Sequence, residues 1–314
     1  MTRAWLDGRL VDAAAPQLTL ADRGFQLGDG TFETLRVRRG VAIEIDVHLG
    51  RLRDGLAVLG IPMPWTDAEL ADGIAAVVRA NAPADAAVRI TVSRGALPGR
   101  GTLPAGWRDA RPTVAVQAWP HVATDPRLLE RGVRAVTATG RRDPSSPLAS
   151  VKTTSRADHV HAKLEAELAG ADDALVLTLA GEIAEATSAN VAIVVGGAVP
   201  GSGAATAHGG VPGSAAGPQR LVTPPLSAGI LDGTTRDWLL GPDGAATLGL
   251  PAVEEAFEPD ALLDAQEALL CSSVAGILPL VELDGRPIGD GGPGPWARRL
   301  REAREAWIVA ASGG

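Results

Sequence analysis

The spacing of apolar residues predicts an α+β unit in the first third of the chain. Between residues 46 and 60 the apolar positions recur every three or four residues, which indicates an amphipathic helix that ends at Gly60. These positions are Leu49, Leu52, Leu56 and Leu59. A second helix is expected after Thr66, because Thr66 and Glu69 have the spacing of a capping box.

Shorter apolar runs predict the strands around these two helices. The segment 3–12 alternates about a central Asp-Gly pair, which is typical of a hairpin, and 32–46 indicates two strands joined at an Arg-Gly turn. Two strong strands, 86–95 and 111–120, flank a glycine-rich loop. The first domain is therefore expected to cover 1–119.

The remainder of the chain predicts a second, larger domain over 128–314, after an interdomain segment at 120–127. A strand at 133–138 is followed by a loop through Lys152 and by a helix over 156–170. The apolar positions of that helix are 157, 160, 164 and 168. Further elements are predicted as a strand hairpin over 172–195, helices over 259–266 and 293–310, and strands over 267–273 and 278–288. The Gly-, Ala-, Pro- and Ser-rich stretch 196–220 is predicted to be a flexible surface loop.

Composition narrows the class of protein. A chain of 314 residues with 46% hydrophobic and 21% charged residues is typical of a globular protein with two domains. A net charge of −8 argues against nucleic acid as a partner, and the single cysteine, Cys271, excludes an intramolecular disulfide and a cysteine-rich zinc site. The sequence has neither a signal peptide nor an apolar run of about 18 residues, so we expect a cytoplasmic protein without a membrane partner.

The use of lysine is the first pointer to chemistry. Of 29 cationic residues only two are lysines, Lys152 and Lys163. Arginine stays charged in proteins, whereas lysine can be deprotonated and become a nucleophile. Lys152 is therefore either a chance surface residue or a lysine that forms a Schiff base.

Other candidate residues are scattered along the chain. Glu185 stands at the end of a predicted strand, Thr234 and Thr235 begin a predicted helix, and Ser272 and Ser273 precede a glycine. An amine, a carboxylate and a phosphate cradle together are what a pyridoxal phosphate site requires. Taken singly, each candidate also has a structural explanation: Glu185 as a rim residue, Thr235 as a helix cap and Ser272 as a turn residue. Phosphate-loop and HExxH motifs do not occur.

The chain resembles the class IV (fold-type IV) pyridoxal-phosphate enzymes, which include branched-chain aminotransferases, D-amino acid aminotransferases and 4-amino-4-deoxychorismate lyases. The resemblance covers nearly the whole chain except 196–220. It rests on seven segments in the family's order: "DRGFQLGDGTFETLRV", "HLGRL", "SRGALPGRG", "SVKTTSR", "ALVLTLAGEIAEATSAN", "GILDGTTRD" and "SSVAGILPLVELDGRPIGDG".

The resemblance implies a role for each matching residue. Lys152 would carry the cofactor as a Schiff base and shuttle the proton, and Glu185 would pair with the pyridine nitrogen. Five further residues would contact the cofactor phosphate: Arg51, Thr234, Thr235, Ser272 and Ser273. The family fold has a small N-terminal α+β domain and a larger C-terminal domain, with the cofactor between them in a homodimer.

Two departures from the family concern the substrate side. Many transaminases of the family have a tyrosine soon after the lysine, where this chain has Arg156, and Leu27 stands where relatives often have tyrosine. Arg156 or an ordered water would then contact the phenolic oxygen of the cofactor, which makes branched-chain specificity doubtful. Arg94 and Arg100 are either clamps for a substrate carboxylate or solvated loop residues, and Glu33 resembles the transaminase pattern.

The preferred function is a transaminase that moves an amino group from an amino acid, with D-amino acids as a candidate class, to pyruvate or 2-oxoglutarate. For this reaction Lys152 must be neutral when it takes the proton, so we expect burial and the cationic cofactor ring to lower its pKa. The alternative enzyme is a 4-amino-4-deoxychorismate lyase that releases pyruvate and 4-aminobenzoate. A degenerate binding protein is a third alternative, against which the combination of Lys152, Glu185 and Arg51 argues.

Overall fold

The computed structural model describes residues 2–15, 17–81, 85–196 and 218–313, and the chain divides into two compact units. Unit 1 combines the residues up to Val122 with Val151–Arg156 and the residues from Ile308 onward. Unit 2 consists of Ala123–Ser150 and Ala157–Trp307. The short segment that contains Lys152 thus belongs to unit 1. The domain limits 1–119 and 128–314 stay a prediction, and most of the predicted loop 196–220 lies outside the described residues.

Unit 1 is built on a six-stranded antiparallel sheet with the order β2-β1-β6-β5-β3-β4. Its strands are β1 (Arg3–Leu6), β2 (Arg9–Asp12), β3 (Gly30–Arg38), β4 (Val41–Ala42), β5 (Asp85–Ser93) and β6 (Thr113–Pro120). The β1–β2 and β3–β4 hairpins turn at Asp7-Gly8 and Arg39-Gly40. All four turn residues have positive φ, as the favoured two-residue hairpin turn requires. Both predicted turns are confirmed.

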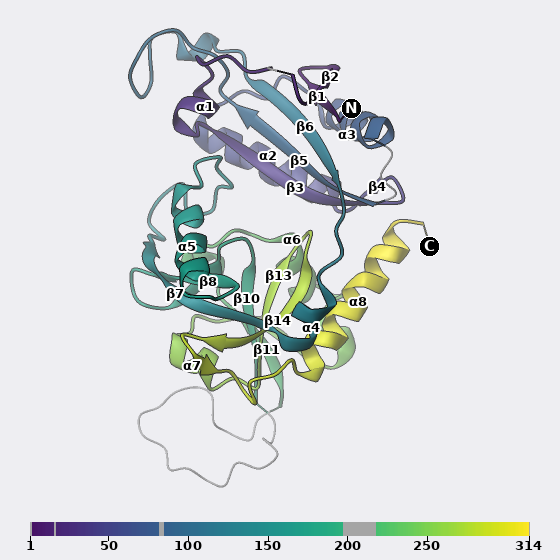
Figure 1. The fold of residues 1–314 in the computed structure, drawn as a ribbon, viewed down its shortest axis with the longest axis vertical. Coiled ribbons are helices and arrows are strands. Elements are labelled where there is room, and N and C mark those ends of the chain that lie inside the picture. The colour runs from purple at the N-terminus through teal and green to yellow at the C-terminus, as the bar shows by residue number, and fades with distance from the viewer. Residues whose placement is uncertain (1, 16, 82–84, 197–217, 314) are drawn as a thin grey trace. The chain divides into compact units, whose positions relative to one another are not determined.

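Two helices, α2 (Ile45–Leu59) and α3 (Asp67–Asn81), cover one face of this sheet (Figure 1). The predicted periodicity of α2 is confirmed, because Leu49, Leu52 and Leu56 are buried against the sheet. Gly60 ends the helix in the left-handed conformation, with a φ of 61°. A third, short helix, α1 (Arg23–Leu27), precedes β3, and a 3-10 turn, η1 (Trp107–Asp109), lies in the loop between β5 and β6.

Unit 2 contains a mixed nine-stranded sheet with the order β12-β11-β10-β13-β14-β7-β8-β9, and β15 pairs with β14. Because β9 also pairs with β10, the path from β10 through β13, β14, β7, β8 and β9 returns to β10 as a closed ring. The strands are β7 (Val133–Arg142), β8 (Asp173–Thr178), β9 (Ile183–Ala186), β10 (Asn190–Val195), β11 (Arg220–Thr223), β12 (Ala252–Glu254), β13 (Glu267–Ser272), β14 (Gly276–Leu283) and β15 (Arg286–Pro287).

The central strands of unit 2 are buried on both faces, which explains their continuous apolar sequence. In β10, Val191 and Ile193 pack into one core, whereas Ala192 and Val194 pack into a second core with helices α6 (Thr234–Leu240) and α8 (Pro295–Ala311). Cys271 of β13 lies in the second core, and burial raises the pKa of its thiol to about 12. The cysteine is therefore a packing residue.

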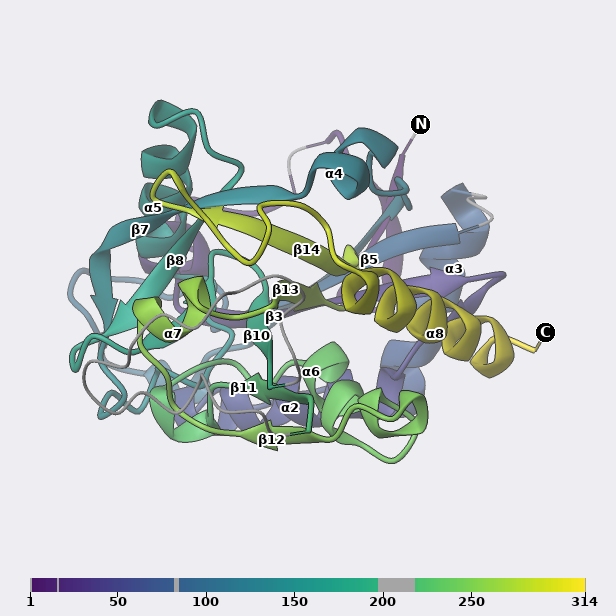
Figure 2. The same cartoon turned by 90° about the horizontal axis from the view of Figure 1, so that it is seen from below.

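Five helices belong wholly or partly to unit 2: α4 (Pro126–Arg131), α5 (Ala157–Leu168), α6 (Thr234–Leu240), α7 (Pro259–Leu263) and α8 (Pro295–Ala311). Two 3-10 turns, η2 (Leu226–Ala228) and η3 (Ala245–Leu248), flank α6 in sequence. In Figure 2, α4 and the start of α8 lie near the same end of β14. Across the described part of the chain, no helix has both the length and the apolar character needed to span a membrane.

Helix α5 turns its small residues, and not its large aliphatic ones, toward the sheet. Ala162 and Ala166 are buried in a small cluster with alanines of β7 and β8. Val160, Leu164 and Leu168 are 66%, 51% and 79% exposed. Alanine lets the helix lie close to the strands, so the apolar spacing in the sequence marks the outer face of α5.

The capping box of α3 gives a test of local stability. Thr66 Oγ1 accepts a hydrogen bond from Glu69 N at 3.3 Å, and Glu69 Oε2 accepts one from Thr66 N at 2.8 Å. Thr66→Ala removes the cap and should lower the free energy of unfolding by about 1 kcal/mol. Urea denaturation measures this change. Thr66→Ser keeps the hydroxyl and should stay near wild type; equal losses in both variants would contradict the capping role.

Candidate active site

The backbone around Lys152 is fixed against β3 within unit 1. Phe32 N donates a hydrogen bond to the Lys152 carbonyl at 3.0 Å, and Thr154 N donates to the Gly30 carbonyl at 2.9 Å. Thr153 forms an isolated bridge with Thr31. The backbone at Lys152 is therefore ordered, although the residue belongs to no helix or strand.

The Lys152 side chain lies over an aromatic ring. Its Nζ is 4.9 Å from the centroid of the Phe32 ring, and Cζ of Arg89 is 3.7 Å from the same centroid. The π system of Phe32 attracts both cations, which favours a defined position for the half-buried lysine side chain.

Glu33, the next residue of β3, holds Arg51. Its carboxylate is 0% exposed and accepts hydrogen bonds from Arg51 Nε and Nη2, both at 2.7 Å, while His48 Nδ1 lies 2.7 Å from Oε2. Burial alone would raise the pKa of Glu33, but the hydrogen bonds and charges of Arg51 and His48 lower it to about 2. Both oxygens of Glu33 are thus engaged, and the bidentate pair sets the orientation of the guanidinium.

Arg94 binds a protein carboxylate. The side chain is buried, and its Nε and Nη2 donate to the two oxygens of Asp29 at 2.7 and 3.0 Å. Nη2 also donates to the Leu59 carbonyl at 2.8 Å. The carboxylate that Arg94 clamps in this structure is therefore Asp29, at the turn that leads into β3.

The glycine-rich loop between β5 and β6 is tied down by Arg23. Arg23 is 2% exposed, and its Nη2 donates to the carbonyls of Gly101 and Thr102 at 3.0 and 2.6 Å. Arg100, in the same loop, is exposed. Leu27, the last residue of α1, is 50% exposed. These two predicted substrate residues lie on the surface of unit 1.

In unit 2, Glu185 of β9 is a buried carboxylate with several donors. It forms an ion pair with Arg142 Nη2 through Oε1, and Leu231 N donates to Oε2 at 3.0 Å. His159 Nε2 lies 3.3 Å from Arg142 Nη2 and 3.8 Å from Glu185 Oε1, while Nδ1 is 2.7 Å from Asp158. Burial alone would raise the pKa of Glu185, but His159, Arg142 and the Leu231 N–H lower it. The carboxylate is therefore held ionised and has lone pairs left for a further donor.

Two orphan hydroxyls lie at the start of α6. Thr234 and Thr235 are 3% and 1% exposed, and neither Oγ1 has a hydrogen-bond partner among the described residues. The N-cap residue Gly233 offers no side chain to the first-turn amides. Buried hydroxyls and uncapped amides at one helix start suit a phosphate group, so these residues fit the phosphate end of the predicted cofactor.

The loop before α6 connects these two features. Asn190, paired with Glu185 across β9 and β10, donates from Nδ2 to the Leu231 carbonyl at 2.9 Å. Glu185 accepts from the amide of the same residue. The backbone three residues before Thr234 is thus held at both its N–H and its C=O.

The structure sorts the predicted residues between the two units. Unit 1 contains Lys152, Arg51, Glu33, Arg94, Arg100, Arg156 and Leu27, and unit 2 contains Glu185, Thr234, Thr235, Ser272 and Ser273. Ser272 and Ser273 are half-buried at the tight connection from β13 to β14.

Sequence reasoning missed Arg142, His159 and Leu231. The Arg142–Glu185 pair spans 43 residues, so no local motif marks it. Within the described ranges, no group of His, Cys, Asp or Glu residues could hold a metal ion.

The Glu33 ion pairs predict an acid-sensitive contribution to stability. Because the pKa of Glu33 is lowered from 4.5 to about 2, its contribution is complete above pH 4.5 and is lost as the pH falls toward 2. Glu33→Gln leaves Arg51 without its counter-charge and should cost roughly 3–5 kcal/mol at neutral pH. The pH dependence between 4.5 and 2 should also flatten.

Denaturant titrations at a series of pH values measure both effects. Glu302→Gln, at an exposed position of α8, is the control and should leave both nearly unchanged. An unchanged acid profile in Glu33→Gln would contradict the assignment.

Comparison with known proteins identifies the family. Residues 30–283 match the family model "Amino-transferase class IV". A Methanocaldococcus jannaschii protein assigned as a branched-chain-amino-acid aminotransferase is 32% identical over 302 residues, which cover 96% of this chain and 94% of that protein. The D-alanine aminotransferase of Bacillus licheniformis is 28% identical over 304 residues, which cover 97% and 96%.

The fold is likewise shared with solved aminotransferases. A Mycobacterium tuberculosis protein described as a hypothetical aminotransferase, solved in its PLP-bound form, superposes with a TM-score of 0.79 and 27% sequence identity. The match covers 98% of this chain and 99% of the other. The α+β architecture with two units is that of the fold-type IV enzymes. The chain therefore belongs to the class IV aminotransferases, a family of pyridoxal-phosphate-dependent enzymes.

Proposed function

We propose that the chain transfers the amino group of an amino acid, with D-amino acids as the favoured class, to a 2-oxo acid such as pyruvate or 2-oxoglutarate. The observation that carries the proposal is the buried Glu185 carboxylate, held ionised by Arg142, His159 and the Leu231 N–H. An ionised carboxylate there can keep a ring nitrogen protonated. The similarity to a D-alanine aminotransferase supports the class of substrate.

The residues that would hold pyridoxal 5′-phosphate divide by the part of the cofactor that they contact. Glu185 would pair with the pyridine nitrogen, and Arg156 would face the phenolic oxygen. The phosphate would be bound by Thr234, Thr235, Ser272, Ser273 and Arg51. When bound, the cofactor supplies an electron sink for the negative charge that forms when a proton leaves the carbon beside the substrate amine.

Lys152 is proposed as the attachment point of the cofactor and as the group that moves the proton. Its Nζ would take the proton from the substrate carbon and return it at the end of the transfer. Arginine cannot replace it, because a guanidinium does not lose its proton in proteins. The hydrogen bonds from Phe32 N to the Lys152 carbonyl and from Thr154 N to the Gly30 carbonyl fix the backbone from which the amine extends.

The residues proposed to act on the substrate are assigned by whether their side chains already have hydrogen-bond partners in the protein. Glu33 is proposed as a positioning residue for Arg51, since both of its oxygens accept from Arg51 and His48. Arg100 is proposed as the clamp for the substrate carboxylate, because Arg94 already binds Asp29. Leu27 would offer an apolar contact to the substrate.

A half-reaction screen tests the proposed substrates. The holoenzyme is mixed separately with D-alanine, L-leucine and aminodeoxychorismate, and the visible absorption band of the bound cofactor is followed. We expect D-alanine to remove the band with release of pyruvate, and aminodeoxychorismate to release none. Pyruvate from aminodeoxychorismate, without a response to D-alanine, would instead identify a lyase.

The two lysines of the chain form a matched pair for testing the catalytic group. Lys152→Ala should lower kcat roughly 10²–10⁴-fold and abolish the cofactor adduct that borohydride fixes to the protein. Lys163→Ala, on α5, should leave both unchanged. Mass spectrometry of the reduced protein locates the adduct, and its detection on Lys163 would refute the assignment.

We also propose that two copies of the chain form a dimer in which the outer face of α5 is covered. Val160, Leu164 and Leu168 form an exposed aliphatic stripe on this face, and Leu179 of the same unit is 67% exposed. Monomeric proteins rarely leave large apolar patches in water. A second copy is the occupant that the family resemblance favours.

Light scattering tests the dimer. The measured mass of the wild-type protein should be twice the 32.1 kDa of one chain. The measured mass of the double variant Leu164→Glu, Leu168→Glu should fall toward that of one chain. Val58→Glu places the same charge at an isolated exposed position of α2 and should remain dimeric. A dimer that tolerates the double variant unchanged would contradict the proposed interface.

A further inference from the structure

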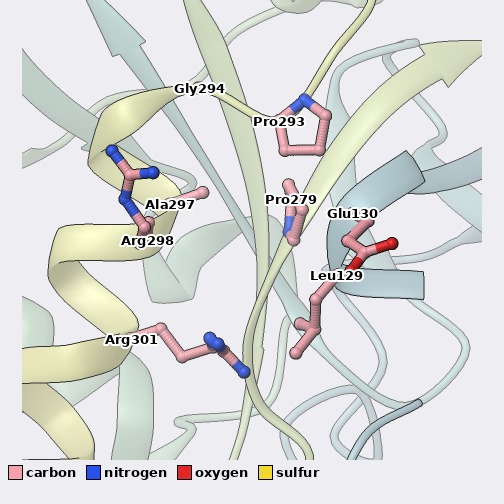
Figure 3. Close-up of a pocket in the computed structure, with 8 residues that line it drawn as sticks. All are labelled: Leu129, Glu130, Pro279, Pro293, Gly294, Ala297, Arg298 and Arg301. Atoms are coloured by element: carbon pink, nitrogen blue, oxygen red, sulfur yellow. The ribbon is translucent and has the colours of Figure 1, made fainter. Parts of the chain in front are cut away.

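A pocket in unit 2 uses none of the residues assigned to the cofactor. It has a volume of about 340 Å³ and lies between α4, β14 and the start of α8. Figure 3 shows Leu129 and Glu130 of α4 on one wall and Arg298 and Arg301 of α8 on the other, with Pro279 of β14 between them. A volume near the lower end of ligand-binding cavities suits one small molecule.

The pocket exists because the edge of β14 that faces away from β13 has no strand beside its first half. The parallel pairing of β14 with β7 begins at Leu280 and Val133, and the chain before Val133 forms α4. Proline is tolerated at strand positions that donate no ladder hydrogen bond, and Pro279 occupies the last position before the pairing begins. The edge is therefore left to α4 and α8, whose separation forms the cavity.

The charged groups of the pocket are not neutralised within the protein. Among the residues that the structure describes, no side-chain hydrogen bond or ion pair involves Arg298, Arg301 or Glu130. Arg301, which is half-buried, points into the pocket, whereas Arg298 and Glu130 are exposed side chains at its two sides (Figure 3). The pocket lining therefore carries two positive charges and one negative charge.

The helix start contributes little to anion binding at this pocket. Trp296 N and Ala297 N donate to the two oxygens of Glu267, each at 2.9 Å. This carboxylate caps α8 from β13 and already satisfies the donors of the first turn. Selection of a ligand therefore depends on the side chains of Glu130, Arg298 and Arg301.

From this arrangement we propose that the pocket binds a free amino acid with an apolar side chain. The two guanidiniums would bind its carboxylate, Glu130 its ammonium group, and Leu129, Pro279 and Ala297 would contact its side chain. A zwitterion matches both signs of charge in the pocket, whereas a simple anion leaves Glu130 unpaired. This site goes beyond the proposed transamination and does not depend on it.

Calorimetric titration of the borohydride-reduced holoenzyme, which cannot turn over, tests the proposal with three probes. Phenylalanine is compared with 3-phenylpropanoate, which lacks the ammonium group, and with 2-phenylethylamine, which lacks the carboxylate. Loss of either charged group should weaken binding roughly tenfold or more. Absence of phenylalanine binding in the millimolar range would overturn the proposal.

Variants assign the binding to this pocket. Arg298→Gln with Arg301→Gln should weaken phenylalanine binding at least tenfold, and Glu130→Gln should remove the preference for phenylalanine over 3-phenylpropanoate. Arg299→Gln is the matched control on the same helix, because that guanidinium lies 4.2 Å from the Trp296 ring and donates to the Leu248 carbonyl. Undiminished binding in the double variant, or an equal loss in Arg299→Gln, would refute the site.

Discussion

The structure depends on keeping carboxylates charged in places where water is excluded. Glu185 is the clearest case, since a buried carboxylate without donors would take up a proton and lose the ability to hold another one nearby. Arg142, His159 and the Leu231 amide prevent this. Three separate parts of unit 2, at the end of β7, on α5 and before α6, must therefore fold correctly around one side chain.

In unit 1, buried carboxylates are likewise kept charged by cationic partners. Glu33 is paired with Arg51, and Asp29 with Arg94, in each case through two guanidinium nitrogens. The planar fork of arginine binds a carboxylate in a fixed direction, which lysine cannot do. The preference of this chain for arginine thus has a structural consequence, because its buried cations orient their carboxylate partners.

Local features of the fold could be predicted from the sequence, because neighbouring residues decide them. The hairpin turns at Asp7-Gly8 and Arg39-Gly40, the end of α2 at Gly60 and the capping box at Thr66 all involve residues that are close neighbours in the sequence. The burial of α5 could not be predicted, because the choice between its alanine and aliphatic faces is made by the strands that it meets.

The site shows the same limit. Lys152 and Glu185 stood out by residue type and by family resemblance, but the partners of the buried charged side chains did not. Arg142, Asp29 and His48 contact residues that are distant in sequence, so only the folded chain reveals which charges are already paired. Arg94 illustrates the consequence, since its loop position suggested a substrate clamp and its actual partner is Asp29.

The attachment of the loop between β5 and β6 bears on how such an enzyme can diverge. Arg23 holds this loop through the carbonyls of Gly101 and Thr102, which are backbone groups that every amino acid supplies. Most side chains of the loop can therefore be exchanged during evolution while the anchor persists. New specificities could arise there by substitution alone, with the scaffold around Glu185 left untouched.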